Sequence, residues 1–338
     1  MSHSIEHIGI LGGGAWGTAL ASSARRAGRP VSLWAREPEV VAAIRANNAN
    51  PDFLPGVDLP EGIDATTDAT AVVARADAVL LVTPAQAVRA TCTALAPHWR
   101  PGVPVVICAK GLETATGAMM GDVVADALPM APLAVLSGPT FASEVGRGCP
   151  TALTLACADR ALGEALVHAL GTPTFRPYWS DDVTGVQVGG AVKNVLAIAC
   201  GIVEGRGLGD NARAALVTRG LAELSRLAGA LGGRPDTLMG LSGLGDLLLT
   251  ATSMQSRNYS LGVALGEGRT LAEVLGERRS VAEGVHTARA VAEMGIRLGV
   301  DLPISAAVDA VLNQDADLDR AIVGLLSRPF RPEPDHNS

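Results

Sequence analysis

The sequence predicts an α/β fold, built on a doubly wound parallel sheet, followed by an all-α C-terminal domain. Short apolar runs alternate with helical patterns through the first half, which is the order of a parallel sheet with connecting helices. A glycine-rich turn breaks the first apolar run, and almost no strand pattern remains after residue 181. We therefore expect a first domain over residues 1–180, a helical domain over 181–330 and a flexible tail over 331–338.

Composition restricts the class of protein. The 338 residues correspond to about two domains, and a hydrophobic share of 48% with only 3% aromatics predicts a core of Ala, Val, Leu and Ile. The formal charge is −7 and the sequence contains no basic block, which argues against a nucleic-acid partner. Five cysteines without a C-x-x-C pair indicate neither a disulfide framework nor a metal site, and free thiols fit a reducing cytoplasm.

Neither the N-terminal segment nor the most apolar run of the sequence predicts a membrane protein. The N-terminal segment 1–7 is polar and lacks the layout of a signal peptide. The most apolar run, near residue 195, contains Lys193 and Asn194 and is shorter than we expect for a membrane span. We expect a cytoplasmic protein without membrane insertion.

The first strand, Ile8–Leu11, runs directly into the segment 12–17 (GGGAWG), and a helical pattern follows. Strand, G-x-G-x-x-G and helix in this order are typical of Rossmann-type dinucleotide binding. Gly12 would permit the tight turn, Gly14 would let the backbone approach a pyrophosphate, and Gly17 would let helix and strand pack closely.

The end of the second strand, Val31–Trp34, bears on the choice of cofactor. The first charged residue after this strand is Arg36, which favours the 2′-phosphate of NADPH. The next residue, Glu37, leaves NADH open. The alternative is that Arg36 is a solvated residue at the start of a helix.

Alternation continues through the rest of the first half. The expected helices cover 38–47, 69–75 and a segment ending at 95, and the expected strands cover 78–82, 105–109, 134–136, 151–155 and 174–176. The connection 48–62 is long and rich in proline, so we expect a functional loop there.

Three segments follow strands and should therefore meet at one edge of the sheet: the glycine loop, Lys110 and residues 137–140. Lys110 suits an anionic ligand, and the backbone near Gly138 and the hydroxyl of Thr140 can donate hydrogen bonds. For Lys110 by itself, a surface lysine in a turn is the simpler interpretation.

The second half reads as helices throughout. Helical patterns cover 181–204, 213–231, 243–250, 259–265, 271–275, 283–298 and 304–312. The first of these is apolar on every side, which predicts a buried helix at the junction of the two domains. A buried ammonium at Lys193 must find a carboxylate or lose its proton, so we expect Lys193 to face the interdomain cleft as a proton-transfer group. Alternatively, Lys193 extends along its own stem to the surface.

Two further segments carry polar groups that point to chemistry. Asp246 and Thr250 are spaced i and i+4 on one helical face, and apolar neighbours make Asp246 a buried carboxylate for which Lys193 is the obvious cation. The alternative is an aspartate that faces the helix dipole. The turn Ser256-Arg257-Asn258 is rich in donors and suits a phosphate, although such turns are also common on surfaces.

These motifs together resemble the bacterial NAD(P)-dependent glycerol-3-phosphate dehydrogenase family over nearly the full length of the chain. The matching segments are 12–17, 33–36 (LWAR), 54–56 (LPG), 110–113 (KGLE), 137–142 (SGPTFA), 193–194 (KN), 243–246 (GLGD), 256–258 (SRN) and 282–284 (AEG). Two departures are mild, because Ala15 removes a hydroxyl that many members have and Thr140 keeps the donor of the usual serine.

The resemblance implies a role for each matching residue. Lys193 resembles the proton acceptor, with Asp246 and Thr250 beside it. The implied substrate contacts are Lys110, Gly138, Thr140, Lys193, Asn194, Asp246, Ser256, Arg257 and Asn258. The implied cofactor contacts are Gly12, Gly14, Ala15, Trp16, Gly17, Arg36, Lys110, Ala142, Arg257, Val281 and Glu283.

The activity implied is the reversible interconversion of sn-glycerol 3-phosphate and dihydroxyacetone phosphate with NADP(H), and NAD(H) as the alternative cofactor. It would supply glycerol 3-phosphate for membrane phospholipid synthesis, and we expect a homodimer. The rival within the enzymes is a dehydrogenase of the ketopantoate or β-hydroxyacid type, whose substrate carries a carboxylate. A non-catalytic NADP(H)-binding sensor is the rival from another class.

Overall fold

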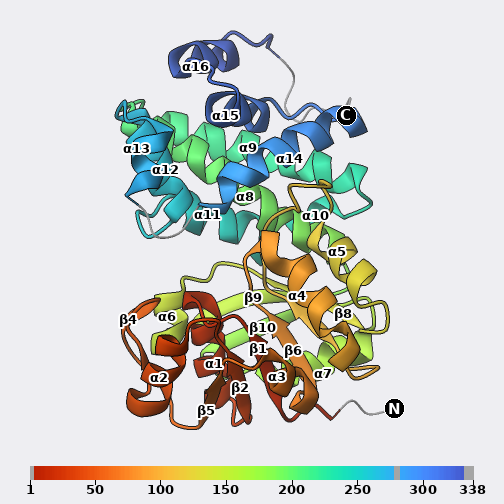
Figure 1. Cartoon of the computed structure of the whole chain (residues 1–338). Coiled ribbons are helices and arrows are strands. Elements are labelled where there is room, and N and C mark those ends of the chain that lie inside the picture. The colour runs from red at the N-terminus through yellow and green to blue at the C-terminus, as the bar shows by residue number, and fades with distance from the viewer. Residues whose placement is uncertain (1–3, 278–281, 331–338) are drawn as a thin grey trace. The chain divides into compact units, whose positions relative to one another are not determined.

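Figure 1 shows the computed structural model of the chain, which describes residues 4–277 and 282–330. The chain divides into two compact units. The first runs up to Glu113 and continues with Ala118–Gln187; the second contains Thr114–Gly117 and the residues from Val188 onward. The division falls inside one long helix, α8 (Val183–Gly205). The tail expected over 331–338 lies outside the described residues.

An eight-stranded sheet forms the centre of the first unit. From one edge to the other its strands are β10 (Phe175–Ser180), β9 (Thr151–Ala156), β8 (Leu133–Ser137), β7 (Val105–Ile107), β6 (Ala78–Leu81), β1 (Ile8–Leu11), β2 (Val31–Trp34) and β5 (Ile63–Thr66). The strand order reverses between β1 and β6. On the β1 side the sheet continues with β2 and β5, and on the β6 side it continues with β7, β8, β9 and β10. In such sheets, ligands bind outside the carboxyl ends of the strands at this reversal.

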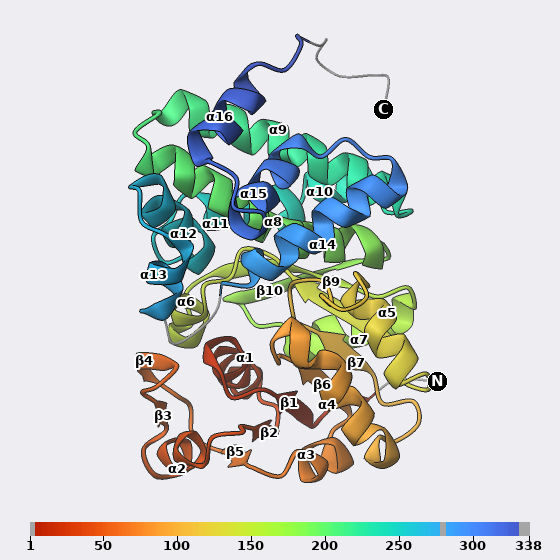
Figure 2. The same ribbon diagram turned by 45° about the horizontal axis from the view of Figure 1, so that its top comes forward.

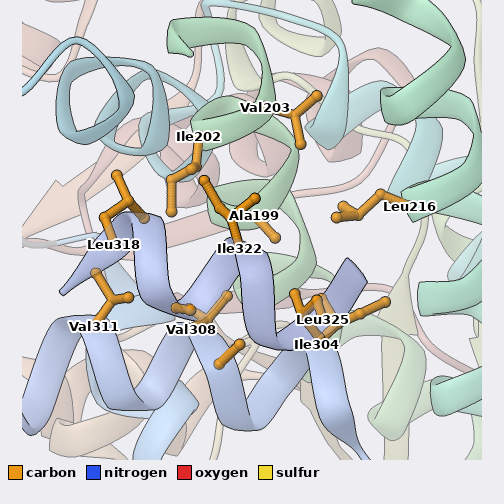
Figure 3. A pocket seen from close by; sticks show the side chains of 12 residues that line it. Ala199, Ile202, Val203, Leu216, Ile304, Val308, Val311, Leu318, Ile322 and Leu325 are labelled. Carbon is orange, nitrogen blue, oxygen red and sulfur yellow. The ribbon is translucent and has the colours of Figure 1, made fainter. Parts of the chain in front are cut away.

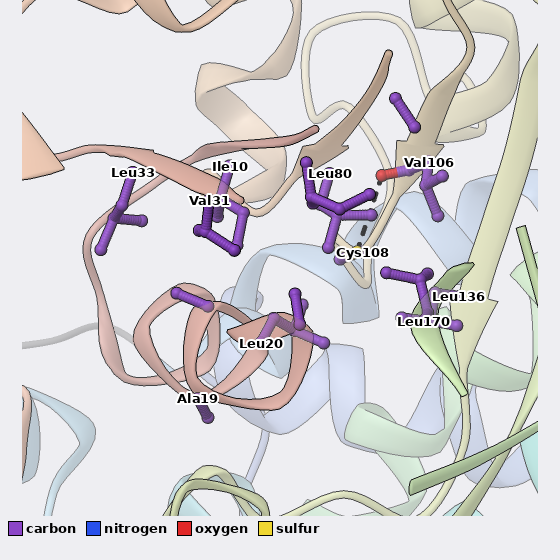
Figure 4. Close-up of a cluster of buried hydrophobic side chains, with 14 of the residues drawn as sticks. Ile10, Ala19, Leu20, Val31, Leu33, Leu80, Val106, Cys108, Leu136 and Leu170 are labelled. Atoms are coloured by element: carbon purple, nitrogen blue, oxygen red, sulfur yellow. Dashed lines mark hydrogen bonds between the residues drawn. The ribbon is translucent and has the colours of Figure 1, made fainter. Parts of the chain in front are cut away.

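Helices cover both faces of the sheet, as the period of two along each strand requires. Ile8 and Ile10 point to one face and Leu11 to the other. The first face packs against α1 (Ala15–Arg26), α2 (Pro38–Asn47), α6 (Ala142–Arg147) and α7 (Arg160–Leu170). The second packs against α3 (Ala69–Arg75), α4 (Val88–Leu95) and α5 (Met120–Ala127). Figure 2 shows α1 and α3 on opposite sides of the sheet, and Figure 4 shows the apolar cluster of the first face.

The doubly wound α/β fold is confirmed, with three differences in detail. β9 pairs antiparallel with β8, so the sheet is not parallel throughout. The loop expected over 48–62 contains an antiparallel hairpin, β3 (Ala49–Asn50) with β4 (Leu54–Asp58). The edge strand β5 and the helices α5, α6 and α7 were not predicted. For α7 the signal was present, since Asp159 accepts hydrogen bonds from the N–H groups of Ala161 and Leu162 as an N-cap.

Within its described residues, the regular elements of the second unit are all helices. They are most of α8, α9 (Asp210–Ala230), α10 (Pro235–Leu238), a π-helical turn η3 (Leu241–Gly245), α11 (Asp246–Ala251), α12 (Arg257–Gly266), α13 (Leu271–Gly276), α14 (Glu283–Leu298), α15 (Pro303–Asn313) and α16 (Leu318–Leu326). The expected all-α domain is therefore confirmed for the described residues, and α10 and α16 add to the elements predicted.

Helix α8 is the core of this unit. With 23 residues it is long and apolar enough to cross a membrane by length and composition, so the expectation that the run is too short was wrong. In the structure, 94% of its most apolar window is buried, as in the core helix of a globular unit. Glycines let it approach α12 closely, because a Cβ atom on Gly201 or Gly262 would overlap a carbonyl oxygen of the other helix.

An apolar cavity of about 50 Å³ lies between α8, α9, α15 and α16 (Figure 3). All of its lining side chains are apolar, including Ile202, Leu216, Val308 and Ile322. It offers no group that could orient an anionic ligand, and the polar side chains singled out by the sequence lie elsewhere.

Candidate functional site

The glycine loop follows β1 and leads into α1, and its three motif glycines differ in what surrounds them. A Cβ atom on Gly12 would lie 2.9 Å from the carbonyl oxygen of Val82, just beyond β6. A Cβ atom on Gly17 would overlap the carbonyl oxygen of Gly12. A Cβ atom on Gly14 would have no protein atom within 4 Å, so this face of the loop is open. The loop therefore fits a pyrophosphate that approaches the Gly14 backbone at the N-terminus of α1.

This difference predicts opposite results for two matched substitutions. Gly17→Ala should lower the free energy of unfolding by about 1–3 kcal/mol, because helix and strand must move apart. Gly14→Ala should change it by less than about 1 kcal/mol, since Gly14 has φ −70° and free space. Gly14→Ala should instead weaken NADPH binding. Urea unfolding and a fluorescence titration with NADPH measure the two effects, and equal stability of both variants would contradict the assignment.

Among the described residues, four buried side-chain polar atoms have no protein partner. Three follow strands of the sheet: Trp16 Nε1 in the first turn of α1, Thr83 Oγ1 after β6 and Ser137 Oγ at the end of β8. The fourth, Ser242 Oγ, lies in η3. A buried donor without an acceptor is costly, so such atoms are suited to hydrogen bonds with a ligand. Sequence reasoning selected Trp16 and placed the segment 137–140 at this edge of the sheet, but it gave Ser137 no role of its own and missed Thr83, although Thr83 also follows a strand.

Arg36 lies at the surface after β2, with 83% of its side chain exposed. Its guanidinium donates to Glu37 Oε1 from Nε at 3.0 Å and from a terminal nitrogen at 2.7 Å. An exposed ion pair of this kind contributes little stability, so Arg36 can turn to a 2′-phosphate at low cost.

The structure brings Lys110, Gly138 and Thr140 together, and their expected meeting at one edge of the sheet is confirmed. Lys110 Nζ and Thr140 Oγ1 each donate to the carbonyl oxygen of Gly138 at 3.1 Å. Gly138 must be a glycine, because a Cβ atom would lie 2.7 Å from Leu153 in the neighbouring strand. Ala142, the first residue of α6, follows shortly after. The cluster holds one positive charge and one hydroxyl, which suits an anionic ligand.

Lys193 and Asp246 form a buried ion pair in the second unit, with only 8% and 1% of their side chains exposed. Lys193 Nζ also donates to Thr250 Oγ1 at 3.0 Å. The expected partnership of these three side chains is confirmed, and Lys193 does not extend to the surface. Their catalytic roles stay a prediction. A lysine held by two fixed acceptors keeps its Nζ in one place, as proton transfer requires.

The segment before Asp246 is not the α-helix expected from residue 243. It forms the π-helical turn η3, with a hydrogen bond from Gly245 N to Gly240 O at 3.1 Å. Gly243 lets η3 pack closely against α10, because a Cβ atom there would overlap the carbonyl oxygen of Leu238. Asp246 then begins α11, which continues directly from η3, because Gly245 is itself in the right-handed helical region. Such π-helical turns are frequent at functional sites.

The turn 256–258 begins α12. Ser256 is the N-cap, and its Oγ accepts the N–H of Tyr259 at 3.2 Å. Arg257 is exposed and Asn258 is buried, with its Nδ2 donating to Asn194 Oδ1 at 3.0 Å. The helix N-terminus, an arginine and two hydrogen-bonding side chains are together suited to a phosphate. The structure thus places Asn194 beside the expected phosphate-binding turn.

Of the last two expected cofactor contacts, the structure describes Glu283, which is the first residue of α14 and is partly exposed. Val281 lies outside the described residues.

Comparison with known proteins identifies the family. The profile described as NAD-dependent glycerol-3-phosphate dehydrogenase N-terminus matches residues 7–163, and the corresponding C-terminus profile matches residues 182–323. The chain belongs to this family. It is 65% identical to the glycerol-3-phosphate dehydrogenase [NAD(P)+] of Rhodospirillum rubrum over 333 residues, which cover 98% of this chain and 95% of the relative.

Solved structures agree with the family assignment. The crystal structure of glycerol-3-phosphate dehydrogenase from Coxiella burnetii superposes with a TM-score of 0.91 at 39% identity, covering 96% of this chain and 99% of that one. A ketopantoate reductase of the PanE/ApbA family from Ralstonia eutropha also shares the fold, with a TM-score of 0.61 at 20% identity, covering 94% and 99%. The fold alone therefore does not separate the two classes of dehydrogenase.

Proposed function

We propose that this chain is a glycerol-3-phosphate dehydrogenase that interconverts sn-glycerol 3-phosphate and dihydroxyacetone phosphate with NADPH or NADH. The observation that carries the proposal is the buried group of Lys193, Asp246 and Thr250 in a member of this family. A sensor that only binds NADP(H) has no need of such a group. We further propose that the enzyme is cytoplasmic, acts as a homodimer and supplies glycerol 3-phosphate for phospholipid synthesis.

Lys193 is the proton-transfer residue in this proposal. The nicotinamide, when bound, accepts or supplies the hydride. Neutral Lys193 accepts the proton of the C2 hydroxyl during oxidation, and protonated Lys193 returns a proton to the carbonyl oxygen during reduction. Asp246 and Thr250 orient Nζ, and Asp246 balances the charge of the ammonium. Lys110 contributes a second positive charge to the binding of the anionic substrate.

Arg257 binds the phosphate group in this proposal, together with the N-terminus of α12. Arg257→Ala should raise the KM for dihydroxyacetone phosphate about tenfold to a hundredfold, because a charge-assisted hydrogen bond is lost. The matched control is Arg269→Ala, which removes an exposed arginine paired with Glu277 just beyond the same helix. Steady-state kinetics at saturating NADPH make the comparison, and an unchanged KM in Arg257→Ala would count against the role.

One assay distinguishes the proposed function from its rivals. The decrease in NADPH absorbance should be rapid with dihydroxyacetone phosphate and absent with ketopantoate. Turnover of ketopantoate would favour the carboxylate-substrate dehydrogenases. A fluorescence titration that shows NADPH binding, without turnover of either substrate, would favour the sensor.

A further inference from the structure

Three elements of the second unit meet through a chain of hydrogen bonds. The backbone N–H of Gly284, in the first turn of α14, donates to Asn258 Oδ1 at 3.1 Å. Asn258, in the first turn of α12, donates from Nδ2 to Asn194 Oδ1 at 3.0 Å. Asn194 lies in α8 directly after Lys193. Asn258 and Asn194 are buried, so both bonds form away from water.

Gly284 sets the donor-to-acceptor direction of this series of hydrogen bonds. A side-chain amide can present either its oxygen or its NH2 group to a neighbour, and its hydrogen-bond partners decide which. A backbone N–H can only donate, so the atom of Asn258 that faces Gly284 must be the oxygen. The NH2 group of Asn258 then faces Asn194, which must turn its own oxygen toward Asn258. The remaining NH2 group of Asn194 is therefore directed away from Asn258.

The first turn of α14 supplies this N–H because of its place in a helix. The first N–H groups of an α-helix have no acceptor within the helix, so Gly284 needs one from elsewhere. Glycine is needed for the close approach. A Cβ atom on Gly284 would lie 2.7 Å from Asn258 Oδ1 and 2.8 Å from the backbone oxygen of Asn194. Any side chain here would push α14 away from both asparagines.

We propose that Gly284 is a positioning residue, which acts through Asn258 to make Asn194 a hydrogen-bond donor to an oxygen atom of the substrate. This inference rests on the proposed function and adds a specificity device to it. A substrate oxygen, whether of the phosphate or of a hydroxyl, accepts a hydrogen bond from the NH2 group of Asn194. An Asn194 turned the other way would present its own oxygen and repel a phosphate.

A double-mutant cycle tests the proposal by the KM for dihydroxyacetone phosphate. Asn194→Ala and Gly284→Ala should each lower kcat/KM on the order of tenfold to a hundredfold, mainly through KM. The double variant should be no worse than the poorer single variant by more than about threefold, because both changes remove the same interaction. Losses that multiply would overturn the proposal.

Asn258→Ala repeats the cycle without adding atoms at a crowded position, in case Gly284→Ala does not fold. Combined with Asn194→Ala, Asn258→Ala should again cause no further loss of kcat/KM. If Asn258 instead contacted the substrate directly and independently, the losses of the two single variants would multiply. The matched control is Gly295→Ala in the same helix, where the new Cβ atom would lie 2.8 Å from Leu302. This control should lower stability while leaving the KM within about twofold, which separates helix strain from positioning.

A measurement without turnover separates failure of this inference from failure of the proposed function. In protein labelled with 15N-asparagine, the side-chain NH2 signals of Asn194 are assigned by their loss in Asn194→Ala. These signals should move in both Asn258→Ala and Gly284→Ala, and hardly at all in Gly295→Ala. If they stay in place in Gly284→Ala, the relay is wrong even when the wild type turns over dihydroxyacetone phosphate. If they move and the wild type is inactive, the relay stands and the proposed function fails.

Discussion

Lys193→Met is expected to lower kcat by about a hundredfold to ten-thousandfold, the usual contribution of a positioned general acid or base. Methionine keeps most of the side-chain volume and removes the amine that we propose accepts and returns the proton beside Asp246 and Thr250. The dissociation constant for NADPH should change by less than about threefold, because the expected cofactor contacts lie elsewhere in the chain. Stopped-flow or steady-state NADPH absorbance measures kcat, and a fluorescence titration measures cofactor binding.

Lys193→Arg is the control for charge. A guanidinium can still pair with Asp246, but it does not lose its proton in a protein, so it cannot act as the base. We expect Lys193→Arg to be nearly as inactive as Lys193→Met while retaining more of the wild-type stability. Near-normal turnover in either variant would remove Lys193 from the mechanism.

Asp246→Ala is expected to lower the free energy of unfolding by about 3–5 kcal/mol, because it leaves the Lys193 ammonium buried without its counter-charge. Urea unfolding at neutral pH measures the loss. The double variant Lys193→Met with Asp246→Leu should recover most of this stability, since a well-packed apolar pair of similar volume often replaces a buried ion pair without loss. The double variant should nevertheless have no measurable dehydrogenase activity.

This set of variants shows whether the ion pair is present for stability or for chemistry. A double variant that is stable and inactive would show that the pair serves the reaction. If Asp246→Ala were as stable as the wild type, Lys193 would have another way to hold or release its charge. The assignment of Asp246 as its partner would then need revision.

Much of the fold follows from patterns that are local in the sequence. The strands β1 and β2 and the helices α2, α3 and α14 begin and end where the sequence predicts. In each case an apolar period is bounded by a turn residue, a cap or a proline. Edge strand β5 was missed because only Ile63 and Ala65 are buried in it, which is too short an alternation to recognise.

The candidate site was predicted unevenly for a related reason. Residue types in unusual surroundings, such as Lys193 in an apolar helix, are visible in the sequence. Thr83 and Ser137 are ordinary side chains in ordinary surroundings, and only the folded structure shows that their hydroxyls are buried without a partner.

The sequence by itself determined the order of strand, glycine loop and helix, the family, and the polar residues that interrupt an apolar core. These are properties of neighbouring residues, whose periods and backbone requirements can be read along the chain. The sequence suggested Asp246, 53 residues away, as the partner of Lys193 and left alternatives open, and the tertiary structure decided for this pair. Only the tertiary structure showed the hydrogen bonds that connect Gly284 with two distant asparagines. Such contacts depend on which helices pack together and on the direction in which each donor points, and that information is not local.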